Sequence, residues 1–516
     1  MLIKIILQKQ TLNKTSMKKT LMFTAALLLA TVFMYGGGIV TNTNQSASWV
    51  RMPARDASLN IDAVYFNPAG LTKMENGFHL SLNSQTIFQN KDVTSTYLFL
   101  NPNPKTFEGN VTAPVFPGVY AAWKKDKIAV SFGFNPIGGG GGAEYEKGLP
   151  VFESQFANII PMLQMSLTPL DAALAAGYTF DPQFRNLTDY SADIYFKGSS
   201  VFFGYQLGFT YQVNELISGF VGGRLVTAKN TYTGHIRDVE IVAAPNALGS
   251  PALYNLTAGN YTPGNYLRGV AQAAGVPLVN AAILNGTAAV LDGLTGDMEV
   301  DAEESGMGFT PIIGLNLFLN EKLNIGLKYE FKTKLELETT VNDNKGAGMF
   351  YQDSIVHSDM PAMLSAGVQY KIISNLTASA GVHYYFDKNA NYGKTLDATG
   401  ELVANDKVID NNYFEVALGL EYAIGEKLVV SGGFLHANTG VSDDYQSDLS
   451  YSLTSNTVGL GLGYKITDKL MINLGGAYTV YQDGNKTQID ATTGESYTNT
   501  YLKDALIIGI GIDFRF

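Results

Sequence analysis

The chain of 516 residues contains no cysteine, which excludes disulfides, thiolate metal sites and cysteine nucleophiles. It has only five histidines, so a histidine-rich metal site has few candidate ligands. Charged residues make up 16% of the sequence, well below the roughly 25% that is usual in soluble domains. The net charge of −11 argues against nucleic acid as a partner, since proteins that bind it carry a basic patch. We expect neither a metal site nor a cofactor.

Motifs of familiar enzymes are missing as well. The sequence contains no G-x-S-x-G, no H-E-x-x-H and no P-loop, so we expect a protein that is not an enzyme. The mean hydropathy is only +0.04 although 46% of the residues are hydrophobic, which excludes a bundle of membrane helices. Low charge together with 11% aromatic residues excludes a disordered chain. Apolar and polar residues must therefore be finely interleaved.

One long apolar run lies near the N-terminus. Residues 17–34 read MKKTLMFTAALLLATVFM, in which Lys18 and Lys19 precede the apolar stretch from Leu21 to Met34. This order is typical of a secretory signal peptide, and the stretch is too short to span a bilayer as a helix. A short buried core helix is the alternative. We expect residues 1–35 to be a signal peptide with an upstream extension, which predicts export.

From residue 77 onward, apolar residues alternate with small or polar ones. At the C-terminus every second residue from Leu506 to Phe516 is apolar, while Gly509, Gly511 and Asp513 lie between them. A strand turns successive side chains to opposite faces, so this pattern predicts strands with one apolar face. About 14 such segments are present, near residues 77–89, 114–123, 127–135, 199–213, 216–232, 306–319, 323–339, 360–373, 376–387, 412–424, 428–438, 450–465, 470–481 and 504–516.

The connections between these segments alternate between short turns and long loops. Transmembrane β-barrels have short periplasmic turns and long extracellular loops, whereas a soluble sandwich has no reason to sort its loops. The pattern therefore predicts an all-β fold: a transmembrane antiparallel β-barrel of about 14 strands over residues 77–516, with long extracellular loops at 136–198 and 233–305. A large soluble β-sandwich is the alternative. The terminal Phe516 resembles the signal read by the outer-membrane assembly machinery, which we expect as a partner.

Residues 36–76 do not alternate, and they carry the resemblance to a known family. The sequence Asp62-Ala63-Val64-Tyr65-Phe66 followed by Asn67-Pro68-Ala69-Gly70 resembles the hatch motif of FadL-type outer-membrane transporters, which carry long-chain fatty acids and other hydrophobic compounds. The resemblance covers the whole mature chain. It implies that residues 36–76 form a hatch inside the barrel. A lumen of this width is too wide for wall side chains to fill and would be a water channel if left open, and an N-terminal plug could fill it.

The third predicted strand is interrupted by proline and five glycines. After Phe134 the chain reads Asn135-Pro136-Ile137 and then Gly138 to Gly142. Proline cannot donate to a ladder and glycine weakens a strand. The family resemblance implies a kink here, at Gly133, Phe134, Asn135, Pro136 and Gly138, that opens the wall and releases a ligand sideways into the membrane; it also implies that Asn67, Pro68 and Ala69 lie beside Gly133–Asn135. The alternative is that the glycines only begin a loop.

The loop at 136–198 contains apolar residues at helical spacing. Phe152, Phe156, Ile160 and Leu163 share one face, and the loop at 233–305 also contains short apolar helical stretches. Loops that face water need a reason to be this apolar. By resemblance, the groove between the two loops is a first docking site for a hydrophobic ligand; the alternative is a lid that only packs.

Inside the lumen, the carboxylate of a fatty acid would need a cation. Arg224 and Lys328 are the candidate partners, and pairing with wall acids such as Glu330 is the alternative. Inward-facing glycines, Gly459 and Gly461 among them, leave room for a plug or a ligand, or else serve strand curvature.

These expectations combine into one functional hypothesis. The chain is expected in the outer membrane of a Gram-negative bacterium, where it contacts membrane lipid and takes up hydrophobic molecules, long-chain fatty acids in particular, by loop capture, lumen binding, hatch rearrangement and lateral release. A hatch-gated porin for small polar solutes and a structural or adhesive barrel are the alternatives.

Overall fold

The computed structural model describes residues 46–175, 187–243, 258–273, 276–346, 348–393, 405–490 and 493–516. The predicted signal peptide and extension at 1–35 lie outside the described residues, as do residues 36–45 of the predicted hatch.

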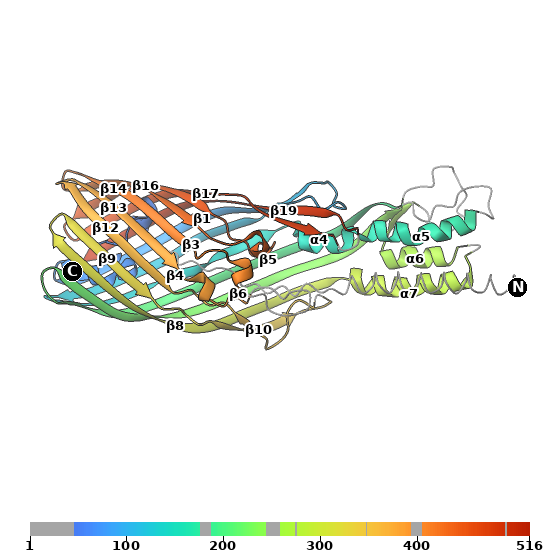
Figure 1. The fold of residues 1–516 in the computed structure, drawn as a ribbon, viewed down its shortest axis with the longest axis horizontal. Helices are drawn as coiled ribbons and strands as arrows, with labels where there is room; N and C mark the ends of the chain where they lie inside the picture. The colour runs from blue at the N-terminus through green and yellow to red at the C-terminus, as the bar shows by residue number, and fades with distance from the viewer. Residues whose placement is uncertain are drawn as a thin grey trace.

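Fourteen strands form one closed antiparallel barrel (Figure 1). Each strand pairs with the next along the chain, and the last closes on the first from His79 opposite Arg515 to Ser95 opposite Asn499. The predicted fold class is therefore confirmed, and each predicted segment overlaps one barrel strand. The strands are β1 Gly77–Ser95, β3 Asn110–Lys125, β4 Ile128–Tyr145, β5 Leu187–Gln212, β6 Ile217–Ala243, β8 Met298–Asn320, β9 Leu323–Glu330, β12 Met363–Ile373, β13 Leu376–Tyr385, β14 Phe414–Ile424, β15 Leu428–Asn438, β16 Ser455–Thr467, β17 Leu470–Tyr481 and β19 Ser496–Arg515.

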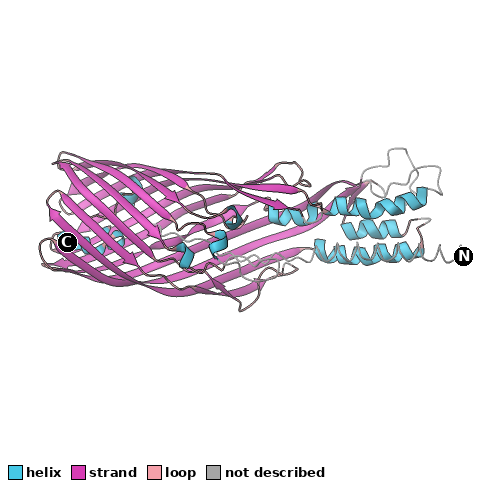
Figure 2. Cartoon of the chain, in the orientation of Figure 1, coloured by secondary structure: helices cyan, strands magenta, loops and turns pink. Residues whose placement is uncertain are grey.

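Short strands and helices complete the described part of the chain (Figure 2). Four short strands extend the ladders of the barrel strands, namely β2 Lys105–Phe107, β7 Gly259–Tyr261, β10 Glu336–Asp343 and β18 Gly484–Ile489, and a fifth, β11 Ile355–His357, pairs with β10. The α-helices are α2 Ala47–Arg51, α3 Ala63–Phe66, α4 Pro150–Ala157, α5 Ile159–Ala175, α6 Pro263–Ala271, α7 Leu278–Thr295 and α8 Asn405–Val408. The 3-10 helices are η1 Pro68–Lys73, η2 Asp387–Asn389 and η3 Asp443–Tyr445.

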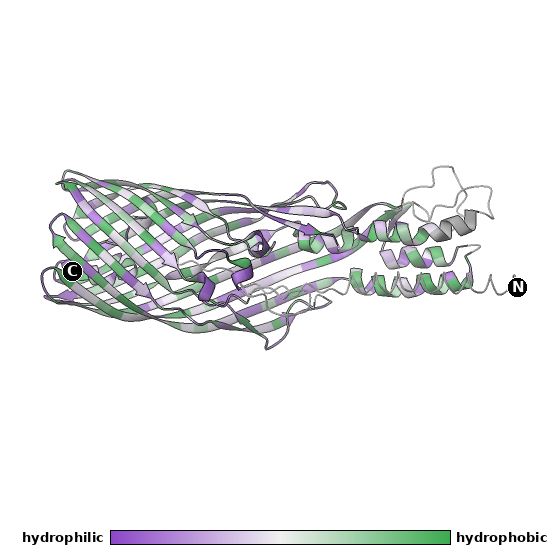
Figure 3. Ribbon diagram, in the orientation of Figure 1, coloured by the Kyte–Doolittle hydropathy of each residue, from purple (hydrophilic) through white to green (hydrophobic). Residues whose placement is uncertain are grey.

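The outer wall is apolar because alternate residues of each strand face outward. In β16, Leu460 is 65% exposed, whereas its neighbour Gly459 is buried on the inner side. The same alternation appears as green stripes over the whole barrel in Figure 3. An isolated protein that exposes this much aliphatic surface needs an apolar solvent, and a closed ladder is the form in which strands satisfy their backbone groups in hydrocarbon.

The long connections are shorter than predicted. The expected loops at 136–198 and 233–305 begin and end inside strands, because β4 continues to Tyr145, β5 begins at Leu187, β6 continues to Ala243 and β8 begins at Met298. These strand ends project beyond the apolar wall (Figure 1). There neither face meets hydrocarbon, so the alternation fades while the ladder continues.

Helices α5, α6 and α7 lie at the far end of these projecting strands. Among the described residues, α7 is the one helix long and apolar enough to cross a membrane by length and composition. It packs against α6 through Ala288 and Leu291, and its Asp292 pairs with Arg268 of α6.

We expect Leu460→Lys to lower the free energy of unfolding by about 2–4 kcal/mol, since this outward side chain lies midway along β16 and a lysine there must enter hydrocarbon. Ile466→Lys, on the same face near the end of β16, is the matched control, with a cost of roughly 0–1 kcal/mol. Urea titration in lipid vesicles measures both, and equal costs would mean that this wall does not face lipid.

Candidate functional site

Residues 46–76, called the internal segment here, lie inside the barrel. Most of the side chains of this segment are buried, and hydrogen bonds tie it to inward-facing groups of strands on opposite sides. Ala47 N donates to Asn83 Oδ1 of β1 at 3.0 Å, and Asn67 Nδ2 donates to the Leu315 carbonyl of β8 at 2.9 Å. Contacts with strands so far apart in the sheet place the segment across the lumen.

Rows of glycine on the inner wall let the segment approach closely. Gly461, Gly475 and Gly509 face one another across β16, β17 and β19, and a Cβ on Gly475 would lie 2.8 Å from the Arg51 backbone nitrogen. A second row joins Gly326, Gly367 and Gly381 across β9, β12 and β13, where the segment presents Asp56. Any larger residue at these positions would displace the segment. The predicted room for a plug therefore corresponds to direct backbone contact.

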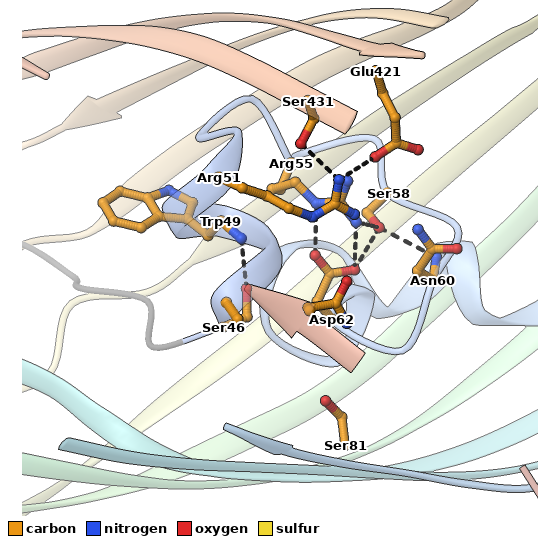
Figure 4. Close-up of polar contacts among 12 residues, drawn as sticks. Ser46, Trp49, Arg51, Arg55, Ser58, Asn60, Asp62, Ser81, Glu421 and Ser431 are labelled. Carbon is orange, nitrogen blue, oxygen red and sulfur yellow. Dashed lines mark hydrogen bonds and ion pairs between the residues drawn. The ribbon is translucent and has the colours of Figure 1, made fainter. Parts of the chain in front are cut away.

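Buried arginines fix the path of the segment (Figure 4). Arg51 donates to Glu421 of β14 at 2.9 Å and to Ser431 of β15 at 2.6 Å. Arg55 instead stays within the segment and forms two bonds with Asp62, at 2.7 and 3.0 Å. One arginine thus binds the segment to the wall, and the other holds the turn between α2 and α3.

A histidine on β13 links the segment to the wall a second time. His383 Nε2 lies 2.6 Å from Asp56 Oδ1, and its Nδ1 lies 2.6 Å from Glu415 Oε2 of β14. Tyr413 donates to the other oxygen of Glu415 at 2.7 Å. The histidine therefore bridges two carboxylates, one on each side of the contact between segment and wall.

Arg224 and Lys328, the candidate carboxylate partners, converge on Glu330. Arg224 forms two bonds with this carboxylate, at 2.7 and 3.0 Å, and the Lys328 amine lies 2.7 Å from it. Lys328 also donates to the Tyr65 carbonyl of the segment at 2.9 Å. Both cations thus pair with an acid of the wall, which was the alternative expectation. An incoming carboxylate would have to compete with Glu330 for them.

The ladder between β3 and β4 is interrupted. The two strands pair from Val119 opposite Phe134 to Lys125 opposite Ile128, and again at Asn110 and Val111, but residues 112–118 and 135–142 do not pair with each other. Each strand keeps its other neighbour, because β3 pairs with β1 and β4 pairs with β5 through two register shifts between Pro136 and Gly141. The five glycines thus lie within β4, and the connection begins after Tyr145 rather than at 136.

Apolar side chains lie behind this interruption. Ile137 is fully buried and packs with Val64, Tyr65 and Phe66 of the segment. Asn135 is buried, and its side-chain amide donates to the Pro136 carbonyl at 2.9 Å. The lumen therefore meets the gap in the ladder through an apolar surface.

The segment residue beside the interrupted strand differs from the expected one. A Cβ on Gly133 would meet Val64 at 3.1 Å, and Gln206, the β5 partner of Gly133, donates to the Val64 carbonyl at 2.5 Å. The motif Asn67-Pro68-Ala69-Gly70 lies farther round the wall. Thr210 of β5 donates to the Pro68 carbonyl, and Ser218 of β6 donates to the Ala69 carbonyl. The wall residue nearest to a Cβ built on Gly70 is Asn316 of β8. The expected placement of Asn67, Pro68 and Ala69 beside Gly133–Asn135 is corrected to Val64.

The apolar loop residues form a packed cluster. Phe152, Phe156 and Leu163 of α4 and α5 are buried against the projecting strands, and Ile160 packs partly buried against the same cluster. A groove opens beside them, lined by Phe152, Tyr195, Phe196, His235, Ile236, Met298 and Met349 among others. Of the four predicted groove residues, Phe152 lines this groove.

An acid from another loop holds α4 in place. Asp448 accepts a bond from Val151 N in the first turn of α4 at 2.7 Å, where a negative charge complements the helix dipole, and from Asn499 and Tyr501 at 3.1 Å. Burial raises the pKa of the Asp448 carboxyl, against the effect of these three bonds. The helix that lines the groove, α4, is thus anchored through Asp448 to β19.

Comparisons with known proteins agree with this architecture. Residues 203–516, more than half of the chain, match the family described as "Outer membrane protein transport protein (OMPP1/FadL/TodX)". Among solved structures, a Pseudomonas aeruginosa FadL homologue is similar at 11% identity and a TM-score of 0.57, over 93% of this chain and 100% of that one. The Pseudomonas putida toluene transporter TodX is similar at 13% identity and a TM-score of 0.51, with the same coverage. A comparison with curated protein sequences finds no match.

We expect Glu330→Gln to lower the free energy of unfolding by about 3–5 kcal/mol, because it leaves Arg224 and Lys328 buried without a counter-charge. Glu336→Gln, which breaks the exposed pair with Lys334, serves as the control and should leave the urea midpoint unchanged. A stable Glu330→Gln protein would show that this cluster contributes little to the fold.

Proposed function

The chain belongs to the OMPP1/FadL/TodX family of outer-membrane transport proteins, and from that premise we propose that it takes up hydrophobic molecules, long-chain fatty acids among them, by passive diffusion and releases them sideways into the membrane. The family is one of transport channels, not of enzymes. The TodX similarity by fold leaves aromatic hydrocarbons as a second ligand class.

The observation that carries the proposal is the interrupted ladder between β3 and β4. A break in the pairing of a barrel wall raises the free energy of the protein in hydrocarbon, because the unpaired backbone groups have no water there as a hydrogen-bond partner. Such a break therefore calls for a functional reason. The surface behind the break is apolar, with Ile137 and Val64 at its centre. An apolar molecule in the lumen gains nothing by entering the aqueous periplasm, so an exit through this gap is favoured.

The path begins at the loops. The groove beside Phe152 and Phe196 offers apolar contact to a ligand outside the membrane, as a first docking site formed between α4 and the projecting ends of β5, β6 and β8. From there the ligand enters the lumen above the internal segment. Phe156, Ile160 and Leu163 support this groove, since they pack in the same apolar cluster as Phe152.

The internal segment acts as the hatch in this proposal. It contacts both the charged lumen residues and the apolar surface behind the gap, through Tyr65 and Val64 respectively. A movement of Val64 away from Gly133 would connect the lumen to the gap at Phe134–Gly138. The segment is held by ion pairs, by hydrogen bonds and by the apolar packing of Val64, Tyr65 and Phe66. Buried ion pairs contribute little net stability because of their desolvation, and a hydrophobic ligand can replace the apolar contacts of Val64, so a rearrangement is feasible.

Deleting two of the five glycines, Gly139 and Gly140, should straighten β4 and restore its continuous register with β5, since the two register shifts amount to two extra residues. We expect uptake of radiolabelled dodecanoate and toluene by cells expressing the protein to fall at least tenfold. Deleting Thr493 and Gly494, in a solvent-exposed turn, is the matched control. If the variant that lacks Gly139 and Gly140 takes up both probes as fast as the native protein, the proposal of a lateral exit is wrong.

A disulfide tests whether the segment must move. The chain has no native cysteine, and a Cβ on Gly381 lies 3.7 Å from that of Asp56, within the range of a disulfide. In the variant Asp56→Cys with Gly381→Cys, the clashing carboxylate is also removed. We expect oxidation to reduce uptake at least tenfold and dithiothreitol to restore it in the same protein.

The reduced form of that variant is its own control for the loss of Asp56. Equal uptake in both redox states would contradict a moving hatch. Steady ion conductance of the oxidised protein in planar bilayers would instead favour a water-filled channel for polar solutes.

A further inference from the structure

Three polar side chains form a row across the inner face of the projecting strands. Asn230 of β6 lies opposite Glu304 of β8, and Glu304 lies opposite Thr339 of β10. Their exposed fractions are only 3%, 0% and 1%. We call these three residues the polar row.

The polar row lies beyond the hydrocarbon layer, on the side of the loops. On the outer face beside it, Lys229 and Glu303 form a partly exposed ion pair at 2.7 Å. Beyond Met307, the outward residues of β8 toward the loops are polar, Ser305 and Glu303 among them. The strands therefore no longer face lipid at this level.

Apolar residues lie on both sides of the row along the same inward face. On the side of the internal segment, Ala228 belongs to the cluster that contains Val64. On the side of the loops, Tyr232 and Ala302 belong to the cluster that contains Phe152. The polar row thus separates the apolar cluster at the groove from the apolar cluster behind the interrupted ladder.

Hydrogen bonds within the row leave two buried oxygens unused. Glu304 Oε2 accepts a bond from Asn230 Nδ2 at 2.9 Å and a longer one from the Tyr232 hydroxyl at 3.4 Å. No described residue donates to Glu304 Oε1 or to Asn230 Oδ1, although both atoms are buried. Buried polar atoms of native proteins almost always have a partner, so this cross-strand pair calls for one from outside the chain.

The surroundings of Glu304 favour its uncharged form. Among the described residues no cation pairs with it, whereas Glu330 is paired with Arg224 and Lys328. Burial raises the pKa of the Glu304 carboxyl, against the effect of its bonds from Asn230 and Tyr232. A protonated carboxyl is a donor and an amide oxygen is an acceptor, and a hydroxyl group can satisfy both because it accepts and donates.

The groove adjoins the row through the connection between β10 and β11. Met349 of this connection lines the groove, and the ring of the next residue, Phe350, stacks on Tyr232 with the ring centroids 4.9 Å apart. Phe350 does not belong to a strand, so its ring can move without a break in the ladder.

We propose that Asn230 and Glu304 bind the hydroxyl group of a hydrophobic alcohol or phenol that passes from the groove into the lumen. The ligand reaches them when Phe350 moves off Tyr232, and its apolar part lies against the clusters on either side of the row. This inference rests on the proposed uptake of hydrophobic molecules and narrows it: between neutral molecules of equal size, the channel prefers the one that carries a hydroxyl.

Binding of radiolabelled 1-dodecanol and of its isomer 1-methoxyundecane to the full chain in lipid nanodiscs tests this. The two probes contain the same atoms, but only the alcohol can donate a hydrogen bond. Affinities are referred to the probe concentration measured in empty nanodiscs. We expect the native protein to bind the alcohol at least tenfold more tightly than the ether.

In Asn230→Leu with Glu304→Leu, the preference for the alcohol should fall below twofold, while the affinity for the ether changes less than twofold. Glu304→Gln, which has the shape of the protonated acid, should keep the preference. Thr231→Leu with Glu303→Leu is the matched control, because these residues form the adjacent cross-strand pair on the outer face. It should bind both probes as the native protein does.

Equal affinity of the native protein for both isomers would mean that water satisfies the two oxygens, and would overturn the hydroxyl site. An unchanged preference in the double leucine variant, or its loss in Glu304→Gln, would overturn the site as well. Each of these results leaves the uptake of hydrophobic molecules standing. If the native protein binds neither probe, the proposed uptake fails together with the hydroxyl site.

Discussion

The closure of β1 onto β19 is the constraint on which the rest of the molecule depends. In hydrocarbon each backbone amide and carbonyl needs a partner from the chain, so the sheet must return to its own first strand. Fourteen strands then enclose a lumen that wall side chains alone do not fill. The internal segment occupies that space. Two rows of glycines across neighbouring strands, one with Gly461 and Gly475 and the other with Gly326 and Gly367, determine how near to the wall it can lie.

The lumen combines two kinds of contact that have different consequences. Ion pairs such as those of Arg51 with Glu421 and of His383 with Asp56 specify where the segment lies, at little net gain in stability. Apolar contacts around Val64 and Ile137 form a continuous hydrophobic cluster between the segment and the wall. The interruption of the ladder between β3 and β4 lies on the apolar side of this arrangement, away from the ion pairs that position the segment.

The sequence predicts the wall well and the interior poorly. Alternation such as that from Leu506 to Phe516 identifies strands, because each position must suit either lipid or lumen. The contacts within the lumen depend on shear and register, which no local pattern encodes. The neighbour of Gly133 is therefore Val64 rather than Asn67, and Lys91 meets Lys503 from the other end of the chain.

The position of the internal segment in the chain has a consequence for biogenesis. Residues 46–76 leave the ribosome before any strand, yet Ala47 and Val50 pack on Gly475 and Gly509, and Arg51 pairs with Glu421. Their docking surface is complete only when translation is nearly finished. The internal segment must therefore remain without these partners until the last strands, β17 and β19, have joined the sheet.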